Sequence, residues 1–382
     1  MGKPPLTGLK VLELARVLAG PWIGQTLADL GADVIKVESP SGDETRQWGP
    51  PFFDISGEPV AAYFLSCNRG KRSIVADFYD DKDLERVRGL AARADVVIEN
   101  FKVGGLRKFG LDYLTLRGAN PGLIYASVTG FGQTGPYADR PGYDFMIQGV
   151  SGIMDLTGDP DGPPQKIGVA YADVLTGLYG VIAIQAALVE RSSSGLGQHL
   201  DLSLLDCMTA TLANQGMNYL ASGVEPTRMG NQHPNIVPYA TFECLDGHII
   251  IAVGNDDQFA RLCDLLAIKR QSKFASNPAR LAGRDAVIEL LETRTKRWRK
   301  EDLLTALIKA QVPAGPINTV GEVFADPQVQ QRGLQISLDG TPGIRSPLNF
   351  SRSPLALNVR APLLGEHQNT HGWGKPATAP KI

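Results

Sequence analysis

The first 130 residues alternate short apolar runs with segments whose hydrophobic positions recur at helical spacing. The apolar runs predict five strands: Leu9–Leu14, Asp33–Glu38, Ser73–Asp77, Val96–Glu99 and Leu123–Val128. Between them, Pro21–Leu30 and Asp83–Ala94 have the pattern of amphipathic helices; Pro suits the first turn of a helix, and Gly31 follows the end of the first one. Strands alternating with helices of this length predict right-handed crossovers and hence an α/β fold with a mostly parallel sheet.

A long helix is predicted after the Gly- and Pro-rich loop Gly158–Gly168. Its apolar run, Val174–Val189, begins directly after Asp173. A short strand near His199–Leu202 and a further helix to about Leu220 follow.

The chain changes character beyond this helix. Tyr239–Cys244 and His248–Val253 are strand-like and flank Asp246-Gly247, which is typical of a two-residue hairpin turn. Mostly helical segments follow from 258 to 310, so we expect a smaller α+β domain here. The predicted division is 1–200 (large domain, N-terminal part), 201–224 (linker), 225–320 (small domain), 321–345 (linker) and 346–382 (return to the large domain).

Composition narrows the class of protein. At 382 residues, with a formal charge of −2, the chain can bury a large core, and neither nucleic acid nor an anionic membrane is expected as its main partner. No apolar stretch approaches the roughly 20 residues of a membrane span. The four cysteines, Cys67, Cys207, Cys244 and Cys263, lack CxxC spacing, which predicts reduced thiols in a cytoplasmic protein and no metal site.

Asp173 is the candidate catalytic residue. A carboxylate on the first turn of a helix faces unpaired N–H groups and the positive dipole end, which would keep it ionised and orient it. An ionised carboxylate held in this way suits nucleophilic attack on a thioester. The structural alternative is a helix N-cap, for which Asp is a favoured residue.

Loops at the carboxyl ends of the strands are the expected ligand site of a parallel sheet. Asn100-Phe101-Lys102 directly follows a strand, so an adenine could stack on Phe101 and phosphates could contact Lys102 or Lys108. Exposed cations are also ordinary on any surface. NAD is not expected, because the first turn offers only Gly20 and Gly24 to a pyrophosphate.

Motifs spread along residues 5–367 resemble the class III coenzyme A transferases, the CaiB/BaiF family. The motifs are Leu9–Leu14, Arg16–Pro21, Gly31–Glu38, Asn68–Ser73, Val97–Phe101, Gly142–Asp144, Tyr171–Asp173 and Ala361–His367. The resemblance implies a Rossmann-like large domain formed by both chain ends, a small domain between them, and an interlocked homodimer. It also implies that Asp173 is acylated by an acyl-CoA through an anhydride and then a thioester, with CoA as a substrate and no metal or prosthetic group.

The same resemblance implies further site residues. The CoA arm and nucleotide would lie near Val17, Leu18, Ala19, Ser39, Ala76, Tyr79, Asn100, Phe101, Lys102 and Lys108. Tyr143 and Asp144 would face the acyl group, and Asn231 and His233 in the loop 223–234 could reach a substrate. Asn231–Pro238 resembles members that use succinyl-CoA with a dicarboxylic acid.

Departures from the family pattern limit the reaction. Formyl-CoA transferases have Gln at the place of Leu18 and Arg at the place of Ser39, which argues against oxalate and formate. An α-methylacyl-CoA racemase is an alternative on the same fold, but Tyr143 stands where its His would be, and a phenol is a poor base near neutral pH. A silent acyl-CoA-binding protein is a third possibility. After His367 the segment 370–380 is a poor helix former, and we expect a frayed tail.

Overall fold

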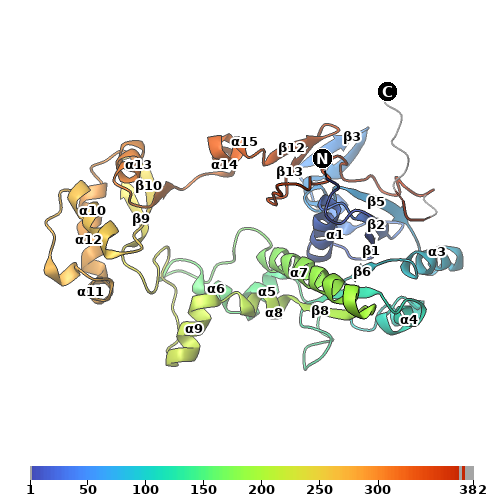
Figure 1. Ribbon diagram of the computed structural model, residues 1–382. Coiled ribbons are helices and arrows are strands. Elements are labelled where there is room, and N and C mark those ends of the chain that lie inside the picture. Colours follow the sequence, from blue (N-terminus) through green and yellow to red (C-terminus); the bar gives the residue numbers. More distant parts are fainter. Residues whose placement is uncertain (1, 370–371, 375–382) are drawn as a thin grey trace. The chain divides into compact units, whose positions relative to one another are not determined.

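The computed structural model describes residues 2–369 and 372–374, which form two compact units (Figure 1). The first unit comprises Met1–Ile153, Lys166–Gly223 and Pro327–Ile382, and the second comprises Met154–Gln165 and Val224–Asp326. The predicted frayed tail spans 370–380, and its residues 370–371 and 375–380 lie outside the described residues.

These boundaries differ from the predicted ones in three places. The predicted linker 321–345 is divided, with 321–326 in the second unit and 327–345 in the first. Residues 201–223 belong to the first unit and are not a linker, because their helix α8 (Leu204–Ala210) packs against α5 (Asp144–Val150) and α7 (Tyr171–Ser194). Residues 154–165 belong to the second unit, where Asp155 pairs with Arg228 at 2.7 Å. Neither contact follows from local sequence pattern.

The first unit is built on a six-stranded sheet. Its strands are β1 (Lys10–Glu13), β2 (Asp33–Glu38), β5 (Lys71–Val75), β6 (Val96–Glu99), β7 (Ile124–Thr129) and β8 (His199–Ser203). They lie in the order β5-β2-β1-β6-β7-β8, and every neighbouring pair is parallel. The predicted α/β class with a large parallel sheet is confirmed.

Helices cover both faces of this sheet. The helices of the unit are α1 (Ala19–Asp29), α2 (Ala62–Leu65), α3 (Asp81–Ala91), α4 (Tyr113–Ala119), α5, α7, α8, α9 (Ala213–Ser222) and α15 (Pro327–Gln331), with 3-10 turns at Glu44–Gln47 and Arg107–Phe109. Alternation along β1 sends Val11 into the core under α1 and α7, and Leu12 into the core under α3 and α4. Each face of the sheet therefore packs against an apolar core, as is typical of buried parallel strands.

The helix α7 packs closely along α1 (Figure 1). Gly177 and Gly180 permit this approach, because a Cβ on Gly180 would lie 2.4 Å from Ile23 Cδ1 and one on Gly177 would lie 3.0 Å from Trp22 Cβ. By length and composition alone, α7 could also cross a membrane, which corrects the expectation that no segment reaches that length. Val181 and Ile184 are buried in the core between α7 and the sheet, and a core helix of this kind passes the same test.

The first unit also contains two short hairpins. They are β3 (Phe52–Ile55) with β4 (Glu58–Ala61), and β12 (Gln335–Leu338) with β13 (Thr341–Ile344). In the first hairpin, Pro59 lies within the second strand, and a Pro inside a short run weakens the strand pattern.

The second unit contains a three-stranded antiparallel sheet in the order β11-β10-β9. Its elements are α6 (Ile153–Leu156) at the boundary, β9 (Tyr239–Cys244), β10 (Gly247–Ala252), α10 (Asp256–Leu265), a 3-10 turn at Ser272–Phe274, α11 (Asn277–Ala282), α12 (Arg284–Thr295), α13 (Lys300–Lys309), β11 (Ala314–Pro316) and α14 (Val320–Ala325). The predicted hairpin is present, but its two turn residues are Leu245 and Asp246, and Gly247 pairs with Cys244. Gly247 has a φ of 135°, which explains the glycine beside the turn.

The close contact between α1 and α7 makes a testable prediction. Gly180→Leu forces a side chain against buried Ile23 and should destabilise the protein by about 1–3 kcal/mol, as overpacked cores do. Gly89→Leu in α3 is the matched control, because a Cβ there meets nothing within 4 Å. Urea unfolding monitored by circular dichroism compares the two; equal midpoints would show that the contact does not constrain α7.

Candidate active site

The strand order locates a crevice at the carboxyl end of the sheet. The chain order of the strands reverses between β1 and β6, which lie side by side in the centre, and ligands of doubly wound sheets bind at this switch point. The loop after β1 contains Arg16–Leu18 and leads into α1 at Ala19, and the loop after β6 contains Asn100–Val103. Both are among the loops in which the sequence predicts a ligand site.

A cavity of about 210 Å³ lies between these loops. Its walls are Arg16, Val17, Leu18, Ala19, Glu44, Asn100, Phe101, Lys102, Val103, Val128, Thr129, Gly130, Ala138, Asp139, Arg140, Pro141, Gly142, Tyr143, Asp173 and Leu204. The cavity thus unites Asp173 with seven other predicted site residues: Val17, Leu18, Ala19, Asn100, Phe101, Lys102 and Tyr143.

Asp173 is the third residue of α7, on the first turn as predicted. It is not the N-cap: that position is Ala170, and among the described residues the Asp173 carboxylate accepts no hydrogen bond. Burial, together with the negative charge of Asp144, raises the pKa of Asp173 to about 7. Sequence analysis expects the helix N-terminus to keep this carboxylate ionised, but desolvation and the like charge of Asp144 oppose that effect and raise the pKa.

Asp144 performs the capping role that sequence analysis considered for Asp173. Its Oδ1 accepts hydrogen bonds from the backbone N–H groups of Ala172 (2.7 Å) and Asp173 (3.3 Å). Its Oδ2 accepts from Gln148 Nε2 at 2.7 Å, and the buried Gln148 accepts from Ile167 N at 2.9 Å through its Oε1. Both carboxylate oxygens of Asp144 are engaged, so Asp144 orients the first turn of α7.

Two tyrosines lie near this turn. Tyr143, directly before Asp144, lines the cavity and is 64% exposed. Tyr63 on α2 was not predicted as a site residue; burial raises the pKa of its hydroxyl, and the charges of Asp173 and Asp144 raise it further. Its phenol therefore stays neutral near the two carboxylates.

The loops after β1 and β6 are joined by Asn100. Its Oδ1 accepts from Arg16 N at 2.9 Å, and its Nδ2 donates to Arg16 O at 2.7 Å. The Arg16 guanidinium lies 5.5 Å from the centre of the Phe101 ring, a cation–π distance. Asn100 lines the cavity, but its amide group is occupied by backbone contacts.

Four predicted nucleotide-site residues do not line this cavity. Ser39 donates to Gly42 O at 3.2 Å, and Ala76 is buried in the core. Lys108 Nζ donates to Tyr79 Oη at 2.9 Å, and Tyr79 is 79% exposed. These two form an exposed cationic and aromatic patch with Phe109.

Asn231 and His233 belong to the second unit. Asn231 lines a cavity of about 460 Å³ with Thr241, His248, Lys300 and Ile317. The His233 ring packs on Tyr239 at 5.3 Å, and its Nδ1 accepts from Asn235 N at 3.0 Å.

Sequence analysis missed several residues of the cavity wall, including Glu44, Asp139 and Leu204. Leu204 directly follows β8, and a search extended to the carboxyl end of the sixth strand would have found it. Glu44 begins the 3-10 turn capped by Asp43, whose buried ion pair with Lys36 no spacing rule indicates.

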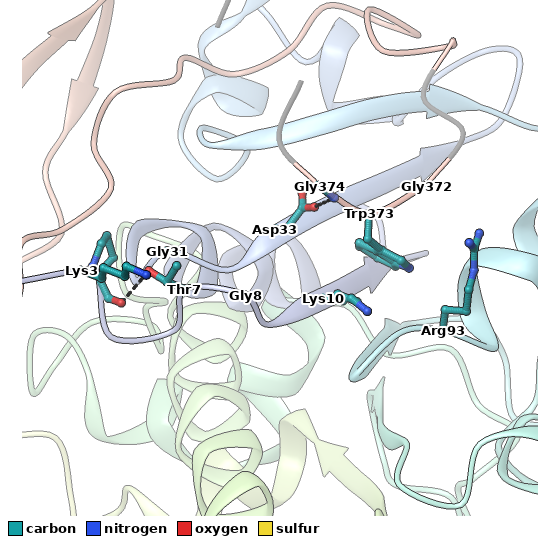
Figure 2. Close-up of a pocket in the computed structure, with 11 residues that line it drawn as sticks. Lys3, Thr7, Gly8, Lys10, Gly31, Asp33, Arg93, Gly372, Trp373 and Gly374 are labelled. Atoms are coloured by element: carbon teal, nitrogen blue, oxygen red, sulfur yellow. Dashed lines mark hydrogen bonds between the residues drawn. The ribbon is translucent and has the colours of Figure 1, made fainter. Parts of the chain in front are cut away.

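A larger cavity of about 710 Å³ lies in the first unit, at the amino ends of β1 and β2 (Figure 2). Lys3, Lys10, Arg93 and Trp373 contribute to its wall, together with Asp33, whose carboxylate binds Arg72 and Gly374 N. None of the predicted site residues lies there. Among the residues that the structure describes, no group of His, Cys, Asp or Glu could hold a metal ion.

Comparison with known proteins identifies the family. The family model described as CoA-transferase family III matches residues 6–368. The chain belongs to the family III CoA-transferases. The resemblance that its sequence motifs indicate is thereby confirmed, and the protein is a CoA-transferase.

Named relatives of this CoA-transferase match nearly its whole length. The succinate–glutarate CoA-transferase of Agrobacterium fabrum is 58% identical and covers 96% of this chain and 94% of its own. The human succinyl-CoA:glutarate CoA-transferase is 40% identical, over 96% of this chain and 85% of its own. The crystal structure of a CaiB/BaiF family protein from Brucella suis has a TM-score of 0.89 and 63% identity, covering 96% of this chain and 98% of that one.

Proposed function

We propose that this CoA-transferase moves coenzyme A from succinyl-CoA to a dicarboxylic acid, with glutarate as the preferred acceptor. The proposal is supported by the names of its relatives from Agrobacterium fabrum and human, both of which transfer CoA between succinate and glutarate species. A relative from Haloarcula hispanica, 39% identical over 95% of this chain and 94% of its own, is a succinyl-CoA:mesaconate CoA-transferase, which also takes a dicarboxylic acid.

One observation supports Asp173 as the nucleophile. Asp173 lines the cavity at the switch point from the first turn of α7 and does not cap that helix, because Asp144 satisfies the N–H groups of that turn. A carboxylate without hydrogen bonds retains its lone pairs for attack on a carbonyl carbon.

The transfer then follows from covalent catalysis at this oxygen. The Asp173 carboxylate attacks the succinyl-CoA carbonyl, the C–S bond breaks, and a mixed anhydride and CoA thiolate form. The thiolate attacks the aspartyl carbonyl, which releases succinate and leaves an aspartyl-CoA thioester. The acceptor carboxylate attacks that thioester, which releases the CoA thiolate and forms a second mixed anhydride. The thiolate attacks the acceptor's carbonyl in this anhydride, which yields the acceptor's CoA thioester and restores the Asp173 carboxylate. Exclusion of water protects the anhydride from hydrolysis.

The racemase alternative receives no support. The named relatives given above are all CoA-transferases, and Tyr143 supplies only a phenol where a base would be needed. Exchange of the α proton of an acyl-CoA without an added acid would favour it.

Asp173→Asn tests the nucleophile. The amide is a far weaker nucleophile of nearly the same shape, so we expect turnover to fall by several orders of magnitude while succinyl-CoA still binds. Turnover is measured with succinyl-CoA and glutarate, with oxalate as a comparison acid. Hydroxylamine or borohydride trapping during turnover, followed by peptide mapping, should mark Asp173 alone. An active amide variant, with deamidation excluded by mass spectrometry, would contradict the proposal.

The raised pKa of Asp173 predicts a pH dependence. The attacking form is the ionised carboxylate, so kcat/KM should rise as the pH increases through about 7 and fall below it. Burial also raises the pKa of Glu99 to about 7, and a second variant separates the two groups. Asp144→Asn removes the like charge but keeps an oxygen for Ala172 N, so it should shift the profile to lower pH. An unshifted profile would assign the titration to another group.

We also propose that the enzyme is a homodimer. The face of α7 that points away from the core carries large apolar side chains, Leu178, Tyr179, Ile182 and Val189, with exposures of 40–73%. Phe145, Met146 and Val150 of the adjacent α5 extend this surface. A continuous apolar surface of this kind suits a protein interface, and a second copy is the occupant that the family resemblance implies.

The buried, unpaired cysteines fit a cytoplasmic location.

Ile182→Glu tests the dimer. A charge in the centre of the apolar face of α7 should produce a monomer in size-exclusion chromatography with light scattering. Leu114→Glu on α4, which is 67% exposed, should leave the mass unchanged. A native protein that is already monomeric at micromolar concentration would refute the proposal.

A further inference from the structure

The loop after β1 contains an unusual backbone conformation. Val17 has a φ of 70°, in the left-handed region that β-branched residues strongly avoid. Such a conformation persists only where its surroundings hold it in place, and it is often found at functional sites. Val17 lines the same cavity as Asp173.

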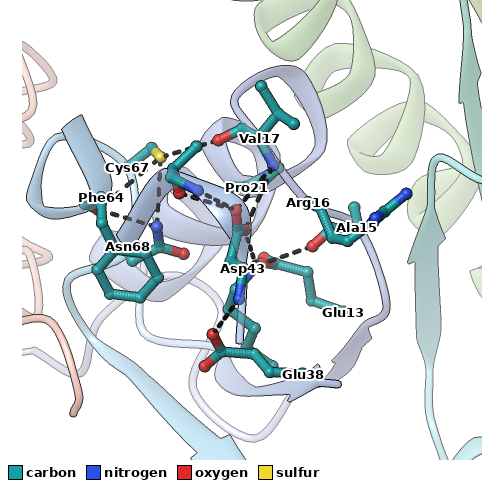
Figure 3. A network of polar contacts seen from close by, with 12 residues as sticks. Glu13, Ala15, Arg16, Val17, Pro21, Glu38, Asp43, Phe64, Cys67 and Asn68 are labelled. Atoms are coloured by element: carbon teal, nitrogen blue, oxygen red, sulfur yellow. Dashed lines mark hydrogen bonds and ion pairs between the residues drawn. The ribbon is translucent and has the colours of Figure 1, made fainter. Parts of the chain in front are cut away.

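Two buried side chains hold the Val17 peptide groups (Figure 3). Val17 N lies 3.3 and 3.4 Å from the two carboxylate oxygens of Asp43, and Cys67 Sγ donates to Val17 O at 3.6 Å. Burial raises the pKa of Cys67 to about 11, so the thiol keeps its proton and remains a donor at neutral pH. Together with the two hydrogen bonds between Asn100 and the Arg16 backbone, these contacts fix consecutive peptide groups of the loop.

Asp43 is itself fixed as an anion. Its side chain is buried, with the Lys36 ammonium at 3.0 Å and two further hydrogen bonds from Thr45, at 3.0 Å from N and 2.8 Å from Oγ1. Burial alone would raise the pKa of Asp43, but Lys36 and Thr45 hold it below its usual value. A charged acceptor makes a stronger bond to the Val17 N–H than a neutral one.

The same turn also reaches the cavity. Glu44, the next residue after Asp43, forms part of the cavity wall on which Val17, Leu18 and Ala19 lie. In Figure 3 the Val17 side chain points away from Asp43, so Asp43 contacts the backbone of the loop and not its side chain. The buried charge therefore acts on the shape of the loop.

We propose that Asp43, paired with Lys36, is a positioning residue that holds Val17 in its left-handed conformation and thereby keeps Arg16–Ala19 in place beside Asp173. Asp43 touches no reacting atom. This role rests on the proposed function for its effect on turnover, but the anchoring of the loop does not depend on which acyl-CoA the enzyme uses.

The experiment combines Asp43→Ala with Val17→Gly. Asp43→Ala should lower kcat/KM for CoA transfer by about ten- to a hundredfold, the range expected when a wall of an active site moves by about 1 Å. Glycine adopts a positive φ without steric cost, so the Asp43 substitution should cost at least severalfold less in the Val17→Gly background. Equal losses in both backgrounds would show that Asp43 does not act through Val17 and would overturn the proposal.

A matched control separates positioning from general destabilisation. Asp29→Ala also removes a buried aspartate, from its pair with Arg69 at 2.6 Å, and Asp29 does not line the cavity. The Asp29→Ala substitution should lower the thermal midpoint but leave kcat/KM unchanged. It should also leave unchanged the effect of Val17→Gly on kcat/KM. A loss of activity that follows the thermal midpoint across all variants would indicate a purely structural role.

Hydrogen exchange makes the test independent of the proposed reaction. The amide of Val17 should exchange slowly in the native protein and in Asp29→Ala, and faster in Asp43→Ala, whether or not succinyl-CoA is a substrate. Unchanged exchange in Asp43→Ala overturns the anchoring. Faster exchange together with no CoA transfer by the native enzyme would refute the proposed function alone.

Discussion

Glu13 lies between two lysine ammonium groups in the interior of the first unit, and the loops around the candidate site depend on this contact. Its carboxylate is 3.1 Å from Lys36 Nζ and 2.8 Å from Lys71 Nζ, and all three side chains are fully buried. The three residues come from neighbouring strands, β1, β2 and β5. Buried ions are costly unless their geometry is close to ideal, and here each ammonium also donates to a backbone carbonyl, of Ala15 or Pro21. The cluster therefore fixes the start of the loop after β1.

At the N-terminus of α7, two carboxylates have different roles: Asp144 caps the helix, and Asp173 is the candidate nucleophile. A single aspartate at this place could either cap the helix or attack a substrate, because a cap commits its oxygens to N–H groups. Asp144 takes the capping role from another helix, and its negative charge adds to the effect of burial in raising the pKa of Asp173. A pKa near 7 keeps a substantial fraction of Asp173 ionised at neutral pH and makes the anion more basic than an exposed carboxylate. The cap and the reactivity of Asp173 are thus linked.

Local pattern in the sequence predicts most of the sheet but not the contacts that build the site. The strands at Asp33–Glu38 and Val96–Glu99 have the predicted bounds, because apolar runs between helices are a strong signal. The Asp144 cap joins residues 28 positions apart, and no spacing rule indicates it. The ion pairs of the strand residues are equally hard to predict. Lys36 lies inside an apolar run, and the sequence does not indicate that its partners are Glu13 and Asp43. The position of Asn100 at the carboxyl end of a strand predicts that it lies near the site. It does not predict that the Asn100 amide binds the Arg16 backbone.

The size of the cavity limits what it can enclose. Sites for drug-sized ligands usually measure about 300–1,000 Å³, and the cavity at Asp173 has about 210 Å³. Under the proposed function it would surround the thioester end of an acyl-CoA, and the nucleotide would lie outside it. Such a division suits the proposed chemistry, because only the anhydride needs protection from water. A rigid wall matters most in a small enclosure, since a loop that moved by an ångström would admit water or displace the carbonyl from Asp173. The need for a rigid wall gives a physical reason for the buried Lys36–Asp43 pair behind Val17. Apolar side chains could hold the sheet there, but they could not accept a hydrogen bond from Val17 N.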